Sequence, residues 1–274
     1  MWSIYAWVFI FGLSIGSFLN VLIYRLPLSL SVNGRSFCPK CKKKISWNDN
    51  IPLVSFVLLR GRCRHCHSPI GLQYPIVELL NGLLFLTVAL FYQGGNYQLS
   101  LQSWNLSEQA IFNFQLGTLI SLLFGWFLVS ALIAVFVIDL KHEIIPDQII
   151  FPSIFITFFV QVITSYPSIL NVLLTALISF LFFLTLHLVT RGRGMGFGDV
   201  KLAFFIGLLL GFPKVLLAFY GAFLTGALLG AILILGRKRR FGQHIPFGPF
   251  LVFWTLVAFF WGETILKWIT ARFF

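Results

Sequence analysis

Two acidic side chains are the residues of this sequence best placed to do chemistry. Asp139 ends one long apolar run and Asp199 opens another, and a carboxylate at the edge of a membrane helix is costly unless it is paired or functional. Two carboxylates held close together cannot both ionise cheaply, so they share a proton. The ionised member can take a proton from water while the neutral member donates to a carbonyl oxygen. The pattern therefore predicts a pair of catalytic aspartates, Asp139 and Asp199, with the chemistry of an aspartic protease.

A glycine-rich, basic segment leads into Asp199. It reads Arg191-Gly-Arg-Gly-Met-Gly-Phe-Gly-Asp199, and its glycines permit positive φ and the close approach of another backbone. An extended substrate could run past this segment and pair with it, so Gly196 and Gly198 are predicted to bind substrate. A flexible turn would explain the same glycines without any function, and the segment alone does not decide between the two.

The four cysteines form a second constellation. Cys38-Pro-Lys-Cys41 and Cys63-Arg-His-Cys66 are two Cys-x-x-Cys pairs in one connection, a spacing that resembles a zinc ribbon. Four thiolates complete a closed tetrahedral site, so we expect a structural zinc ion that lets a loop too small for its own core fold. His65 and His67 are substitute ligands that this reading does not need. The alternative is four free or redox-active cysteines.

Long apolar segments must position both the two aspartates and the four cysteines. The chain of 274 residues is 58% hydrophobic and only 10% charged, with a mean hydropathy of +0.92, which indicates a polytopic membrane protein. No cleavable signal peptide is evident, so the first run is expected to stay as a helix, with Asn20 bonding across to a neighbouring helix. We predict an all-α fold with about eight transmembrane helices, at approximately 4–26, 75–92, 113–138, 148–164, 168–189, 200–212, 214–235 and 248–267.

The basic residues set the orientation of these helices. Seventeen of the 20 lysines and arginines fall in the odd-numbered connections, and only Lys214, Lys267 and Arg272 fall on the other side. Since basic loops stay in the cytoplasm, we expect cytoplasmic odd-numbered loops and both termini outside. The basic clusters include Arg193 and Arg237-Lys-Arg-Arg240. This topology explains the net charge of +12 without a nucleic-acid partner.

Three parts of the chain follow from this layout. Residues 1–26 are the first transmembrane helix, residues 27–74 a cytoplasmic zinc-binding loop, and residues 75–274 a transmembrane aspartyl protease domain. Glu78, at the start of the second helix, is either a buried partner for arginines of the loop or part of a second site. Asp147 is expected to cap the fourth helix and Lys201 to anchor the sixth on its basic side.

Taken in order along the chain, these elements resemble the type IV prepilin peptidases, over nearly the full length. The Gly-x-Gly-Asp element alone is weak, but with the upstream aspartate and the cysteine loop it is highly specific. The matching segments are Gly16-Ser-Phe-Leu-Asn-Val-Leu-Ile-Tyr-Arg25-Leu-Pro27, both Cys-x-x-Cys pairs, Asp49-Asn-Ile-Pro52, Gly61-Arg-Cys-Arg64, Tyr74-Pro-Ile-Val-Glu78, Asp139 through Ile145-Pro-Asp147, Gly196-Phe-Gly-Asp199-Val-Lys-Leu202 and Ile245-Pro-Phe-Gly-Pro249.

The resemblance implies an intramembrane aspartyl protease of the bacterial inner membrane. Such enzymes cut the basic leader from prepilins or pseudopilins at the cytoplasmic face, and Asp139 and Asp199 match the two catalytic aspartates by position. The family then methylates the new N-terminal amine with S-adenosylmethionine, and the loop with all four cysteines places this chain in the bifunctional branch. No glycine-rich nucleotide fingerprint that follows a strand is visible in the sequence.

Two other classes of protein remain open. A proton-coupled transporter would use Asp139 and Asp199 as a relay, but it would need acids at the bilayer midplane, whereas both lie at the predicted cytoplasmic edge. A non-enzymatic scaffold of a pilus or secretion machine predicts that changing either aspartate is silent. Asp139 alone could also be a carboxylate that water solvates or that Lys141 pairs with.

Overall fold

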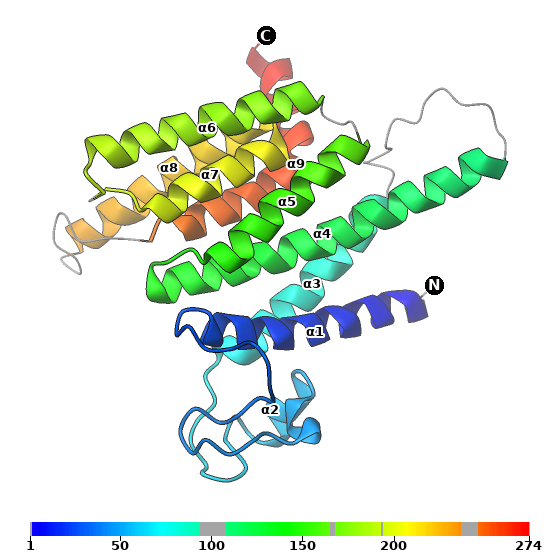
Figure 1. Cartoon of the computed structure of the whole chain (residues 1–274), viewed down its shortest axis with the longest axis vertical. Coiled ribbons are helices and arrows are strands. Elements are labelled where there is room, and N and C mark those ends of the chain that lie inside the picture. The colour runs from blue at the N-terminus through cyan, green and yellow to red at the C-terminus, as the bar shows by residue number, and fades with distance from the viewer. Residues whose placement is uncertain (1, 94–107, 165–167, 193, 237–245, 274) are drawn as a thin grey trace. The chain divides into compact units, whose positions relative to one another are not determined.

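The computed structural model describes residues 2–93, 108–164, 168–192, 194–236 and 246–273 (Figure 1). Contacts divide the chain into an N-terminal unit, Met1–Ala134, and a C-terminal unit, Val135–Phe274. Arg193, the basic cluster 237–240 and Ile245 lie outside the described residues. The elements in chain order are α1 (Trp2–Arg25), η1 (Trp47–Asn50), α2 (Val54–Leu58), α3 (Gln73–Gln93), α4 (Glu108–His142), α5 (Asp147–Thr164), α6 (Ile169–Val189), α7 (Phe197–Leu210), α8 (Lys214–Leu235) and α9 (Gly248–Phe273).

Seven of the described helices are long and apolar enough to cross a membrane, namely α1, α3, α4, α5, α6, α8 and α9. The described residues are helical apart from turns, loops and two isolated β-bridges, which confirms the predicted all-α polytopic fold. The sixth predicted helix, 200–212, exists as α7 but has only 14 residues, so at 1.5 Å per residue it is about 21 Å long. That length is too short for a hydrocarbon layer of about 30 Å.

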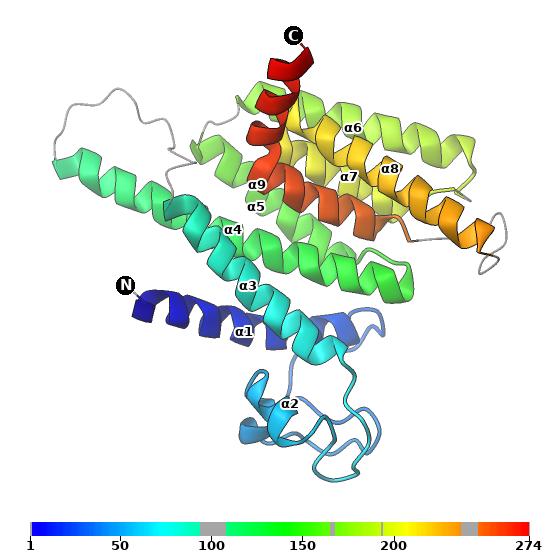
Figure 2. The same cartoon turned by 180° about the vertical axis from the view of Figure 1, so that it is seen from behind.

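Helix α7 lies among the other helices of the C-terminal unit, contacting α5, α6, α8 and α9 (Figure 1). Ten of its 14 residues are buried, as expected for a helix that is apolar on all sides. It approaches α6 closely at Gly207, where an added Cβ would lie 2.8 Å from the Cα of Ala176. Figure 2 shows α8 and α9 packed side by side in the same unit.

In the N-terminal unit, α1 and α3 pack against each other through small residues. A Cβ on Gly12 would lie 2.8 Å from the Cα of Gly82, so the two backbones approach in the way that glycine permits in membrane helices. Buried Asn81 donates to the carbonyl of Gly12 at 2.7 Å and accepts from the Ser130 hydroxyl at 3.1 Å. This network joins α1, α3 and α4.

Asn20 supplies another bond between α1 and α3. Its Nδ2 donates to the carbonyl of Tyr74 at 3.0 Å, and its Oδ1 accepts from Gln73 at 3.3 Å. The predicted hydrogen bond from Asn20 to a neighbouring helix is confirmed. Both bonds fix the end of α1 from which the cysteine loop departs.

Candidate active site and metal centre

Asp199 is held at the N-terminal end of α7. The N-cap of this helix is Gly196, and the Gly196 N–H donates to Oδ2 of Asp199 at 3.2 Å while the Asp199 N–H donates back to the Gly196 carbonyl at 3.2 Å. These two bonds hold the carboxyl group at the positive end of the helix dipole. The side chain is buried, with 7% of the residue exposed.

Asp139 lies in the last turn of α4, one turn before the helix ends at His142. It is also buried, with 5% of the residue exposed. Its Oδ2 has no hydrogen-bond partner among the described residues. Buried polar atoms are almost always bonded, so this oxygen is placed to meet a proton, a water molecule or a substrate that the fold itself does not provide.

The backbone of Gly248, the first residue of α9, lies against the Asp139 carboxyl. A Cβ added to Gly248 would be 2.5 Å from Oδ2 and 3.0 Å from Cγ of Asp139, so every residue except glycine would displace the acid. In the sequence this glycine belongs to the Ile245-Pro-Phe-Gly-Pro249 segment, from which no role for it was predicted. The sequence feature that could have indicated this role is a glycine directly before Pro249 at the start of a helix.

The two predicted catalytic residues both lie in the C-terminal unit, at helix ends and buried. Asp139 acts on the carboxyl group of Asp199 through its charge. Two buried carboxyl groups that feel each other's charge cannot both be ionised at low cost. They can therefore hold one proton between them, which is what acid and base catalysis by a pair of aspartates requires.

The two glycines predicted to bind substrate have local structural roles. Gly196 uses its N–H to cap Asp199, and an added Cβ on Gly198 would lie 3.0 Å from the Cβ of Ile145. These contacts explain both glycines without a substrate. Their predicted contact with substrate stays a prediction.

Beside the acid pair, Lys201 forms an ion pair with Asp147. The Lys201 Nζ lies 2.6 Å from Oδ1 of Asp147, at the first residue of α5. The ammonium also lies 5.2 Å from the ring centroid of Phe197 and 5.6 Å from that of Phe151. The lysine read from sequence as an anchor therefore links α5 to α7, the helix that carries Asp199.

The four cysteines converge in the N-terminal unit. Their Sγ atoms all lie within 4.8 Å of one another, and those of Cys38 and Cys66 are 3.8 Å apart. A tetrahedral zinc ion with Zn–S bonds of about 2.3 Å holds its sulfur atoms about 3.8 Å apart. The thiols are free rather than disulfide-bonded. The cluster therefore has the ligands and the spacing to hold a metal ion, and zinc fits it.

The two Cys-x-x-Cys pairs fold in the same way. In each, the N–H of the first cysteine donates to the carbonyl five residues on, from Cys38 to Lys43 and from Cys63 to Ser68, both at 2.9 Å. The residue after the second cysteine has positive φ in both turns, 60° at Lys42 and 53° at His67. Each turn therefore directs the sulfur atoms of its two cysteines toward the point where all four sulfur atoms gather. Hydrogen bonds from Ser68 lower the pKa of the Cys66 thiol to about 6, whereas burial and the neighbouring thiols raise the pKa of Cys41 to about 11.

With both sites described, comparisons with known proteins decide the family. The model of the Bacterial Peptidase A24 N-terminal domain matches residues 10–92, and that of the Type IV leader peptidase family matches residues 126–231. A prepilin leader peptidase/N-methyltransferase of Aeromonas hydrophila is 34% identical, over 99% of this chain and 96% of its own length. The chain belongs to the type IV leader peptidase family.

Other relatives of the type IV leader peptidase family carry the same name. The Legionella pneumophila protein is 32% identical over 97% of this chain and 94% of its own length. The Pseudomonas aeruginosa protein is 31% identical over 93% of this chain and 90% of its own length. No solved structure matches the chain. The resemblance read from the motifs is thereby confirmed.

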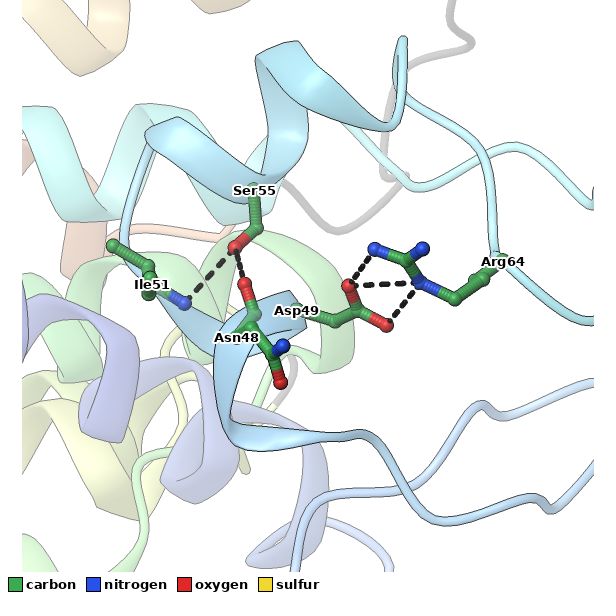
Figure 3. Close-up of polar contacts among 5 residues, drawn as sticks. All are labelled: Asn48, Asp49, Ile51, Ser55 and Arg64. Carbon is green, nitrogen blue, oxygen red and sulfur yellow. Dashed lines mark hydrogen bonds and ion pairs between the residues drawn. The ribbon is translucent and has the colours of Figure 1, made fainter.

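In this leader peptidase, an ion pair fastens the second cysteine turn to η1. Arg64, between Cys63 and Cys66, donates through Nε and NH2 to Asp49 at 2.6–3.1 Å (Figure 3). The bond from Arg64 lowers the pKa of Asp49. In the same view, the Ser55 hydroxyl donates to the Asn48 carbonyl at 2.7 Å and so fixes α2 on η1.

Two further residues of the family motifs anchor the cysteine loop to the helices. Buried Arg25, the last residue of α1, donates to four backbone carbonyls at 2.8–3.0 Å, those of Ser31, Val32, Asn33 and Arg35. Glu78 in α3 accepts the N–H of Leu53 at 2.9 Å. Glu78 was expected either to pair with arginines of the loop or to belong to a second site, and among the described residues it accepts a backbone amide rather than an arginine.

Proposed function

We propose that this chain is an aspartyl endopeptidase that removes the leader of type IV prepilins or pseudopilins. The observation that carries the proposal is the buried Oδ2 of Asp139, which has no partner among the described residues and whose carboxyl group acts by its charge on a second buried carboxyl group, Asp199. Such an oxygen is expensive to maintain in a fold unless it is used. Membership in the leader peptidase family supplies the class of substrate.

The chemistry follows from one proton shared by the pair. The ionised carboxylate takes a proton from water, and the water oxygen bonds to the carbon of the scissile carbonyl. The protonated carboxyl group gives its proton to the carbonyl oxygen. As the tetrahedral intermediate collapses, the C–N bond breaks and the nitrogen leaves with a proton from the pair. Low dielectric around the buried acids strengthens each of these interactions.

The membrane setting fits a substrate with a basic leader ahead of an apolar helix. Asp139 lies in the last turn of the span 117–142, and Asp199 at the start of α7. We infer that both lie near the cytoplasmic face of the bacterial inner membrane, because the basic residues of the odd-numbered loops favour that side. Both termini are then periplasmic.

We further propose that the chain methylates the new N-terminal amine with S-adenosylmethionine. The proposal draws on the names of its relatives, prepilin leader peptidase/N-methyltransferase. The cysteine cluster holds a structural zinc ion in this scheme, because four thiolates leave no open coordination position for water or substrate. The zinc fixes the loop and takes no part in cleavage.

The test uses purified protein in detergent with a synthetic prepilin peptide. Asp139→Asn and Asp199→Asn are assayed separately for loss of the leader, and for methylation of a peptide that already lacks it. We expect each change to abolish cleavage and to leave methylation intact. Asp147→Asn is the matched control, because this acid lies in the same unit but is exposed and paired with Lys201.

Two results would contradict the proposal in different ways. Cleavage that persists in either aspartate variant removes the acid pair from the mechanism, whereas the scaffold and transporter alternatives predict that the wild-type protein does not cleave the peptide at all. Loss of methylation in both variants would mean that the two activities share one site.

A further inference from the structure

A cavity of about 330 Å³ lies within the N-terminal unit. Its walls come from the C-terminal part of α1, the first turns of α3 and the cysteine loop, and its lining residues run from Ser17 to Glu78. This volume is within the range of small-molecule sites. The acid pair and the rest of the C-terminal unit contribute no residue to the lining, so cleavage does not account for the cavity.

One carboxylate in the lining has no cationic partner among the described residues. Of the acids that line the cavity, Asp49 is paired with Arg64, whereas Glu78 accepts only neutral donors such as the Leu53 N–H. Arg25 also lines the cavity, but its guanidinium group donates to four backbone carbonyls and not to Glu78. A buried carboxylate is costly without a positive charge nearby, so Glu78 suits a ligand that carries one.

Aromatic rings face the same cavity. Tyr24, Phe37, Phe56 and Tyr74 line it, and the rings of Tyr24 and Phe37 meet edge to face at 6.2 Å. Aromatic faces attract organic cations and stack on planar heterocycles. The rim adds Lys40, Lys43 and Lys44, which suit a carboxylate. A ligand with a cationic centre, a flat ring and a carboxylate matches these three features together.

We propose that this cavity is the site for the methyl donor, S-adenosylmethionine, and that Glu78 faces its sulfonium centre. The aromatic residues take the adenine ring and the lysines the carboxylate. The inference rests on the proposed methyltransferase activity and assigns the residues that would carry it. In the transfer, the amine nitrogen bonds to the methyl carbon while the C–S bond breaks. The sulfur keeps that electron pair, and the methylated amine releases one proton to water.

The site also gives the metal cluster a function in the same unit. Cys38 and Cys63 both line the cavity, so the wall is formed partly by the two cysteine turns. A closed metal site would hold that wall in place without touching the reaction. Donor binding should therefore depend on the metal, although the metal does no chemistry.

The test measures equilibrium binding to the full-length protein in detergent, by calorimetry. S-adenosylmethionine carries the sulfonium charge, and S-adenosylhomocysteine is the same molecule with a neutral sulfur. We expect Glu78→Gln to weaken binding of the first about tenfold and of the second less than about threefold. A purely structural role for Glu78 would weaken both equally and would overturn the assignment. The matched control, Glu263→Gln, changes an acid of α9 and should alter neither.

A second measurement needs no variant. Ultraviolet cross-linking of tritiated S-adenosylmethionine to the wild-type protein, mapped by mass spectrometry, should label peptides within 17–78, the span of the lining residues. Label confined to the C-terminal unit would overturn the site while leaving the methyltransferase proposal standing. If the wild-type protein binds no donor at all in calorimetry, the methyltransferase proposal itself fails.

Discussion

The cysteine loop and the acid pair are built on opposite principles. The cysteine ligands lie within one connection, from Cys38 to Cys66, and short turns fix them. The two aspartates are 60 positions apart, on α4 and α7, and the charge of Asp139 acts on Asp199 only through the packing of the C-terminal unit. Local turns and a bound metal ion can form the cysteine site within its own loop, whereas the acid pair depends on the packing of the whole C-terminal unit. This difference predicts which substitutions disrupt each site.

The largest effect is expected at the acid pair, where the two members should act as a unit. Asp139→Asn and Asp199→Asn should each lower the rate of leader cleavage at least about 10³-fold, and the double variant should be no slower than either single one. The reason is that one proton serves both groups. Single-turnover cleavage rates of the three variants give the measurement, with metal content as a check that the cysteine loop is unaffected. Additive losses would mean that the aspartates act independently.

The next effect concerns the cysteine loop. Changing Cys38 and Cys41 together to serine should lower the zinc content from one ion per chain to none, since two thiolates cannot hold the closed site. Elemental analysis of the purified protein measures this. Cleavage should fall much less than methylation, because the acid pair lies in the other unit. Full retention of zinc in the double variant would refute the metal site, and an equal loss of both activities would remove the contrast between the two regions.

A smaller effect is expected from Gly248→Ala. The added methyl group would lie 2.5 Å from Oδ2 of Asp139, so the carboxyl group must move, and we expect cleavage to fall about 10- to 100-fold. The loss should appear in kcat more than in KM if glycine positions the acid. Gly262→Ala is the control in the same helix, because there the nearest atom is 3.4 Å away in the flexible side chain of Lys214. Equal activity of the two variants would remove Gly248 from the site.

The smallest effect concerns the ion pair of Asp49 and Arg64. Since Arg64 lowers the pKa of Asp49, the pair stabilises the loop above the pKa of an unfolded aspartate, about 4. That contribution is lost as pH falls through the lower, folded value. An exposed arginine limits it, so Asp49→Asn should speed zinc release at pH 7 by less than about fivefold. The rates of wild type and variant should converge as the pH falls below the lowered pKa of folded Asp49, and a constant ratio would contradict the ion-pair explanation.

Some features that the sequence left undecided became clear only from the packing. Glu78 could have paired with a loop arginine, but Arg25 binds four carbonyls and Arg64 binds Asp49. The sixth predicted span is a short buried helix, and composition alone does not distinguish a helix surrounded by protein from one surrounded by lipid. Lys201 was read as an anchor because an ion pair with Asp147, 54 positions away, has no local signal.

The sequence by itself determined the all-helical membrane fold, the four cysteines that could hold a metal ion, the candidate aspartates and the family. Each of these rests on apolar runs or on short spacings between neighbouring residues, and such patterns can be recognised in the sequence alone. The tertiary structure decided that Oδ2 of Asp139 is buried without a partner, that Gly248 lies against it, and that Glu78 faces a cavity. Burial and close approach depend on side chains from helices far apart in the chain, so only packing in three dimensions could assign them.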